Sequence, residues 1–132
     1  LSRIRQFATP LSRVASQTRH HSHCGAGKSL LQADTKGDLY SCNWFMNDNE
    51  EKLGSLTTLN EKKLEPYQAT LIEANQCDSC WARYLCGGGC MAVHKNYSGQ
   101  RHSKDPKFCK RTRHIAAEMI SYYADYMQGS TV

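Results

Sequence analysis

The stretch Cys77-Asp-Ser-Cys-Trp-Ala-Arg-Tyr-Leu-Cys-Gly-Gly-Gly-Cys90 places four cysteines and three consecutive glycines within fourteen residues. A Cys-x2-Cys step lets two sulfurs reach one metal, or one edge of a metal cluster, from a single turn. A Cys-x5-Cys step requires the chain to loop around what it holds. Glycines at positions 87–89 would let the backbone pass close to a bulky inorganic core and donate N–H groups to its sulfurs. This segment therefore predicts a metal or metal-cluster site.

Composition restricts the class of protein to which the chain belongs. The chain has 132 residues, enough for one domain but small for a large enzyme core, and 39% of them are hydrophobic. Its apolar runs are short, so we expect no transmembrane helix, and its N-terminus lacks the apolar core of a secretory signal peptide. Because the first residue is not Met, we expect a piece of a longer protein. We predict a cytoplasmic location and no membrane partner.

The chain contains seven cysteines. An odd number would leave one thiol unpaired in a closed disulfide framework. Without an export signal, the reducing cytosol is the expected compartment, and clustered cysteines there bind metal more often than they form disulfides. The cysteines are therefore interpreted as metal ligands.

Turn residues and hydrophobic periodicity predict a small, irregular α+β domain with a β-hairpin, short helices and a C-terminal helix. In the first half we expect a helix over residues 1–19 that breaks or restarts at Thr9–Pro10. We also expect a hairpin over 29–43, whose turn uses a left-handed Gly37, and an extended piece over 53–56. In the second half we expect mostly helical residues over 60–76, helical turns over 91–97, a loop over 98–108, and a final helix from Cys109 that ends at Gly129.

The spacing of all seven cysteines forms a pattern over most of the chain. It reads Cys24-x12-Gly37-x4-Cys42, a long gap, Cys77-x2-Cys80-x5-Cys86-x3-Cys90, eighteen residues, and Cys109. This pattern resembles, at every position, the seven-cysteine signature of the SPASM domain, the C-terminal auxiliary-cluster domain of radical S-adenosylmethionine enzymes. The resemblance covers about residues 24–115. Local features such as Cys24-Gly-Ala-Gly27 and Glu51-Lys-Leu-Gly-Ser-Leu56 look most like the peptide-modifying branch. That branch includes thioether-forming peptide maturases and the maturase of quinohemoprotein amine dehydrogenase.

The resemblance implies two [4Fe-4S] clusters with interleaved ligands. The first auxiliary cluster would be held by Cys24, Cys42 and Cys90. The second would be held by Cys77, Cys80, Cys86 and Cys109. The chain would then cross from one ligand set to the other after Cys86, at the triple glycine.

The first ligand set is one residue short of four. No cysteine precedes Cys24 in this chain, so its fourth iron would be open, available to a substrate thiolate, or held by another group. His20, His21 and His23 are close enough in sequence to be considered. The alternative interpretation places these three histidines in a surface loop.

The same resemblance implies a part of an enzyme rather than a complete one. Radical chemistry with S-adenosylmethionine needs a Cys-x3-Cys-x2-Cys motif, and Cys86-x3-Cys90 is followed by Met, Ala and Val. The chain should therefore not be active alone. We expect residues 1–19 to connect to an upstream radical SAM barrel domain that binds S-adenosylmethionine, residues 20–128 to form the SPASM domain, and residues 129–132 to form a tail. Electron transfer and positioning of a peptide or protein substrate are the implied roles.

The formal net charge of +5 does not indicate a nucleic-acid partner. Seven thiolates and two oxidised four-iron clusters would reduce it to about +2. No Lys/Arg stripe is interleaved with aromatic residues. The basic residues around Cys109, which include Lys104 and Arg113, fit either a solvated basic face or stabilisation of its thiolate.

Two other classes of protein compete with this interpretation. A zinc-binding interaction module would place Cys77, Cys80, Cys86 and either Cys90 or Cys109 around one zinc ion, which leaves the remaining cysteines unexplained. A secreted disulfide domain would contain oxidised pairs and no metal.

Two further features are interpreted as structural. The Gly25-to-Ser29 segment resembles the end of a phosphate-binding loop but lacks the glycine that this motif needs at position 22. The aromatic residues near the cysteines are expected to pack around the clusters; they are Tyr40, Trp44, Phe45, Trp81 and Tyr84.

Overall fold

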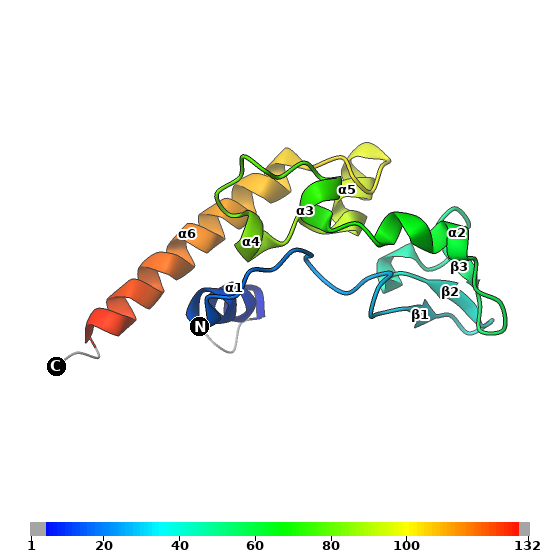
Figure 1. Cartoon of the computed structure of the whole chain (residues 1–132), viewed down its shortest axis with the longest axis horizontal. Coiled ribbons are helices and arrows are strands. Elements are labelled where there is room, and N and C mark those ends of the chain that lie inside the picture. Colours follow the sequence, from blue (N-terminus) through cyan, green and yellow to red (C-terminus); the bar gives the residue numbers. More distant parts are fainter. Residues whose placement is uncertain (1–4, 130–132) are drawn as a thin grey trace. The chain divides into compact units, whose positions relative to one another are not determined.

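The computed structural model describes residues 5–129 and contains both helices and a small antiparallel sheet (Figure 1). The predicted α+β class is confirmed. The chain forms two compact units: one contains the N-terminal residues up to His23 together with the residues from Leu71 onward, and the other is Cys24–Thr70. Within the described residues, no helix combines the length and the apolar character needed to cross a membrane. The expected domain boundaries after residues 19 and 128 stay predictions.

The first unit is helical. Its elements are α1 (Arg5–Ser16), α3 (Leu71–Ala74), α4 (Arg83–Cys86), α5 (Met91–Ser98) and α6 (Pro106–Gly129). Helix α6 is by far the longest, and α1 packs against both α6 and α4 (Figure 1). The buried apolar side chains of this unit are Leu71, Ile72, Ala82, Met91, Phe108, Ala116 and Met119. The described end of the chain coincides with Gly129, so the predicted tail lies almost entirely outside the described residues.

Helix α1 continues through Pro10, so the break predicted at Thr9–Pro10 is wrong. A proline inside a helix removes one backbone hydrogen bond and costs about 3 kcal/mol. Packing of the amphipathic helix against α4 and α6 offsets that loss. Residues 1–4 of the expected helix lie outside the described part of the chain.

Helix α6 begins at Pro106, three residues before the predicted start at Cys109. The Asp105 carboxylate accepts a hydrogen bond from the Lys107 N–H at 2.8 Å, which is the interaction of an N-cap residue. Proline is favoured at the first helical position because its missing N–H would have no helical partner. Cys109 therefore lies within the first turn of α6 instead of opening it.

The second unit contains the sheet. Strands β1 (Gln32–Ala33), β2 (Asp38–Tyr40) and β3 (Lys52–Ser55) pair antiparallel in that order, and the unit also contains the short helices η1 (Asn43–Phe45), α2 (Glu61–Leu64) and η2 (Glu65–Tyr67). The predicted hairpin is confirmed, with Gln32 opposite Tyr40. Gly37 has a φ of 82°, and Asp34 accepts two backbone N–H hydrogen bonds within the turn. Helix α2 ends at Leu64 and Pro66 lies at the start of η2, so this segment is entered twice, as the position of Pro66 predicted.

A chain of buried polar groups joins the sheet to η2. The Ser41 hydroxyl donates to the Tyr67 hydroxyl at 3.1 Å, and Tyr67 donates to the Glu51 carboxylate at 3.0 Å. All three residues are buried, and the Tyr67 ring fills the space beside Gly27. Since a buried polar group without its partner is costly, this chain fixes the position of η2 against the strands.

Tyr67→Phe tests this network. We expect it to lower the free energy of unfolding by about 1–3 kcal/mol, because Ser41 and Glu51 each lose a buried partner while the ring packing remains. Urea titration followed by circular dichroism measures the change. The exposed Tyr97→Phe is the control and should change stability by less than about 0.5 kcal/mol. Equal effects of the two variants would show that the buried network does not stabilise the unit.

Candidate metal centre

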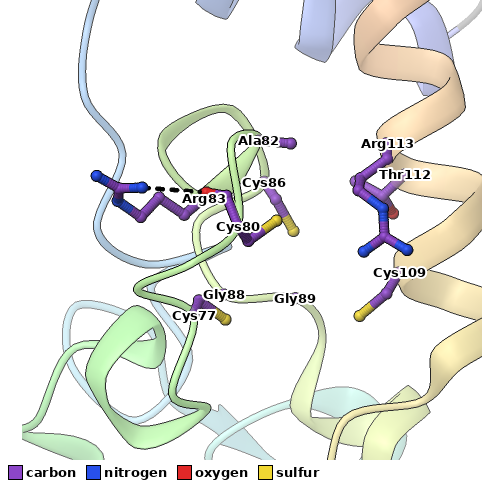
Figure 2. A pocket seen from close by; sticks show the side chains of 10 residues that line it. All are labelled: Cys77, Cys80, Ala82, Arg83, Cys86, Gly88, Gly89, Cys109, Thr112 and Arg113. Atoms are coloured by element: carbon purple, nitrogen blue, oxygen red, sulfur yellow. Dashed lines mark hydrogen bonds between the residues drawn. The ribbon is translucent and has the colours of Figure 1, made fainter.

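Four of the seven cysteines line one pocket in the first unit. They are Cys77, Cys80, Cys86 and Cys109, the second ligand set of the sequence analysis. Figure 2 shows three of the thiols on the segment around α4, facing the Cys109 thiol across the pocket on α6. The pocket encloses about 340 Å³ of empty space, part of which is open to solvent. Residues far apart in the sequence are thus brought to one place.

Local backbone structure positions each thiol. Cys77 follows α3, and its N–H donates to the Ile72 carbonyl. In the next turn, the Cys80 N–H donates to the Cys77 carbonyl. Cys86 is the last residue of α4. Cys109 is in the first turn of α6, where its N–H bonds the Asp105 carbonyl. Two of the thiols therefore come from short turns, the third from the end of the short helix α4, and the fourth from a long helix.

Burial in the pocket favours the neutral thiols. It is the main cause that raises the pKa of Cys86 to about 11, and the neighbouring Cys109 and Cys77 raise it further. Burial also raises the pKa of Cys77 and that of Cys109. Because several thiolates in one pocket repel one another, the site needs added positive charge before it holds four thiolates.

Two cations supply part of that charge. Lys104 lowers the pKa of both Cys77 and Cys109, and Arg113 lowers that of Cys109, although burial outweighs both effects. Arg113 also lines the pocket, one helical turn after Cys109 (Figure 2). The direction of these effects favours the Cys109 thiolate, while both side chains are also exposed, so both interpretations of the basic residues stay open.

The triple glycine forms the pocket wall next to Cys86. Gly87, Gly88 and Gly89 have φ values of 72°, 84° and 86°, a left-handed conformation that other residues rarely adopt. A Cβ atom at Gly87 would collide with the Ser22–His23 backbone, and one at Gly88 would collide with the Leu71 backbone. These positions therefore need glycine both for conformation and for space.

Arg13 of α1 caps the carbonyl end of α4. Its guanidinium donates to the Leu85 carbonyl at 2.6 Å, to the Cys86 carbonyl at 3.2 Å and to the His23 carbonyl at 3.1 Å. The last carbonyls of a helix lack helical partners, and a cation there satisfies them. Helix α1 thus supports the segment that carries Cys86, although it lies outside the cysteine pattern.

His23 is not a free loop histidine. Its Nδ1 lies 3.1 Å from the Cys86 carbonyl, and its ring packs edge-on against Phe108. Burial lowers the pKa of His23, so the neutral ring is favoured. His21 is exposed and contacts the Tyr84 ring, and His20 donates its backbone N–H to the Tyr84 carbonyl. A ligand role for any of the three stays a hypothesis.

The other three cysteines belong to different units. Cys24 and Cys42 lie in the Cys24–Thr70 unit, and Cys90 precedes α5 in the helical unit. All seven cysteines are free thiols in this structure. Across residues 5–129, no three His, Cys, Asp or Glu side chains come close enough together to hold a single metal ion. The ligand assignment of the first set therefore stays a prediction.

The aromatic residues divide into two groups. Tyr40 and Phe45 are buried and Tyr84 is half-buried, but 77% of Trp44 and 55% of Trp81 are exposed. The prediction that the whole set packs around the cysteines is thus wrong for the two tryptophans. Each follows a cysteine closely in a short turn, where the backbone directs the side chain outward instead of into the unit.

Two buried polar residues beside the triple glycine were missed by sequence reasoning. Asn75 is 2% exposed and donates to the Gly88 carbonyl at 2.6 Å. His94 is fully buried, with Nε2 at 3.4 Å from the same carbonyl. Neither has a ligand-like spacing to the cysteines, so no motif could have found them. Only the folded backbone brings them to Gly88.

The comparison with protein-family models finds no match to this chain. The comparison with curated proteins finds none either.

Gly88→Ala tests the steric requirement of the pocket wall. Gly99 provides a matched control, because its φ is 78° but nothing lies within 4 Å of an added Cβ. Gly99→Ala should cost about 1–2 kcal/mol of unfolding free energy for the left-handed conformation alone. Gly88→Ala should cost about 1–3 kcal/mol more, because the Leu71 backbone must move. Equal losses in urea titrations would show that the close contact at Gly88 is not needed.

Proposed function

We propose that this chain is a SPASM-type auxiliary iron–sulfur domain of a radical S-adenosylmethionine enzyme that modifies a peptide or protein. The observation that carries the proposal is the pocket that gathers Cys77, Cys80, Cys86 and Cys109 beside a glycine-only backbone. These four residues would hold one [4Fe-4S] cluster through thiolate bonds. When bound, such a cluster supplies one-electron transfer.

The arrangement of the four thiols favours a cluster over a single zinc ion. A zinc ion requires every sulfur at about 2.3 Å from one point. The four thiols line the walls of one pocket and come from two separate segments, the one around α4 and α6. A four-iron core spans more space and binds one thiolate at each iron, so ligands that surround a pocket suit it better.

The charges around the pocket also support an anionic cofactor. Four thiolates outweigh the positive charge of an oxidised four-iron core, so the loaded site is negative. Lys104 and Arg113 offset part of this charge from the side of α6 and the loop before it. Lys104 is also held in place, since its ammonium donates to the Gln76 carbonyl at 2.9 Å.

For the first ligand set, the proposal draws on the cysteine pattern alone. Cys24, Cys42 and Cys90 would hold a second [4Fe-4S] cluster whose fourth ligand is open or supplied by another group. The chain lacks the Cys-x3-Cys-x2-Cys motif, so we place S-adenosylmethionine in an upstream barrel domain. The domain would work in the cytoplasm, where it would exchange electrons with that upstream domain and help to position the substrate.

Metal analysis of the anaerobically isolated chain tests the proposal. We expect about eight iron and about eight sulfide ions per chain, with the broad visible absorption of [4Fe-4S] clusters. One zinc ion without sulfide would contradict the proposal and support the interaction module. No metal and oxidised cysteine pairs would support the disulfide class.

Cys86→Ala tests the separation of the two ligand sets. We expect this variant to lose about half of the iron and sulfide, because only the second set contains Cys86. Cys24→Ala is the matched variant for the other set, and its remaining cluster should differ from that of Cys86→Ala in its paramagnetic spectrum. Complete loss of iron in both variants, with helical circular dichroism intact, would show that the two sets are not separable.

A further inference from the structure

The Gly88–Gly89 peptide is held by buried side chains on its carbonyl side. The Asn75 amide donates to the Gly88 oxygen at 2.6 Å, and the His94 Nε2 lies 3.4 Å from it. Both residues are almost completely buried, at 2% and 0% exposure. Two polar side chains that are shielded from water therefore converge on a single backbone oxygen.

The tautomer of His94 follows from its second contact. Its Nδ1 accepts the Asp105 backbone N–H at 3.2 Å, so a neutral ring carries its proton on Nε2. That proton then faces the Gly88 oxygen. Because Asp105 immediately precedes α6, His94 also connects the triple glycine with the helix that carries Cys109.

The opposite side of the same peptide faces the thiols. All described peptide bonds are trans, so the Gly89 N–H points away from the Gly88 oxygen. Gly89 lines the pocket together with Cys86, and its N–H lowers the pKa of the Cys86 thiol, as a donor directed toward that sulfur does. Because Asn75 and His94 hold the Gly88 carbonyl, the Gly89 N–H on the opposite side of the peptide is directed toward Cys86, a candidate ligand.

The stability of the fold alone does not explain why a buried asparagine occupies position 75. Its Oδ1 is buried and has no hydrogen-bond partner among the described atoms. Such an unpaired acceptor costs about 1–3 kcal/mol, a cost that an apolar side chain of the same shape would avoid. The donation from Nδ2 to Gly88 is the compensating contact.

We infer that Asn75 and His94 are positioning residues that orient the Gly88–Gly89 peptide so that the Gly89 N–H donates to the Cys86 sulfur. The inference rests on the proposed function for its consequence: this hydrogen bond raises the reduction potential of the cluster bound by the second ligand set. Reduction adds negative charge to a cluster and its sulfurs, and an N–H donor stabilises that charge. Asn75 contributes more than His94, because its contact is shorter.

Asn75→Leu and His94→Phe remove the two donors with little change in shape. Hydrogen–deuterium exchange with single-residue resolution reports on the Gly89 N–H in the isolated chain, whichever metal it contains. We expect exchange at Gly89 to become at least about tenfold faster in Asn75→Leu, and to change less in His94→Phe. The exposed Asn96→Leu and His114→Phe are controls and should leave it unchanged. His94→Gln, which keeps a donor and an acceptor, should remain close to the wild type.

Potentiometric titration of the iron-loaded chain tests the consequence. Asn75→Leu should lower the midpoint potential of one cluster and leave the other unchanged. In the Cys86→Ala background, Asn75→Leu should leave the potential of the remaining cluster unchanged. A general loosening of the fold would instead move both potentials or affect both backgrounds.

Each failure has a separate meaning. If Gly89 exchange is the same in Asn75→Leu and the wild type, the inference is wrong whether or not iron is bound. If exchange accelerates but neither potential moves, the peptide is oriented as inferred but does not tune the cluster. If the chain contains no iron, the proposed function fails, and the exchange rates still decide the orientation. If Asn75→Leu does not fold, the exchange rate of the Gly89 N–H is compared between His94→Phe and His94→Gln instead. Equal rates in these two variants would contradict the inference.

Discussion

The left-handed backbone of Gly87–Gly89 is the constraint on which the candidate metal centre depends. All three residues have positive φ, and Gly87 and Gly88 pass so close to the Ser22–His23 and Leu71 backbones that no side chain fits. This path ends α4 immediately after Cys86 and places Cys90 at the start of α5. A residue other than glycine would have to move either the backbone that carries Cys86 or one of the segments packed against it.

The surroundings of this backbone path show how a small helical unit can hold several thiols together without disulfides. Arg13 satisfies the carbonyls at the end of α4, and Asn75 and His94 satisfy the carbonyl of Gly88. For the Gly88–Gly89 peptide, these contacts lie on the carbonyl side, opposite the Gly89 N–H. The thiols themselves repel one another once ionised, so the pocket is an arrangement that a positively charged metal core would complete.

Much of the coarse architecture could be predicted from the sequence, because it depends on local signals. The hairpin follows from Gly37 and the flanking β-formers, and Pro66 lies at the start of a second helical turn, where proline is favoured. Helix α6 begins three residues before the predicted start, because Asp105–Pro106 is itself a helix-start signal. The continuation of α1 through Pro10 could not be predicted, since it depends on packing against α4 and α6.

For the candidate site, the resemblance of the cysteine pattern to the SPASM signature implied which cysteines to group, and folding brings Cys77, Cys80, Cys86 and Cys109 to one pocket. The residues that support the site could not be predicted, because Asn75 and His94 act through one backbone carbonyl and carry no motif. The exposure of Trp44 and Trp81 could not be predicted either, because composition does not indicate which way a side chain in a short turn points.

Anomalous diffraction at the iron edge from anaerobically grown crystals tests the central claim most directly. The account predicts a four-iron density feature in the pocket, bonded by Cys77, Cys80, Cys86 and Cys109, with Cys90 bonded elsewhere. A single metal peak in that pocket, or Cys90 in place of Cys109 among its ligands, would contradict it.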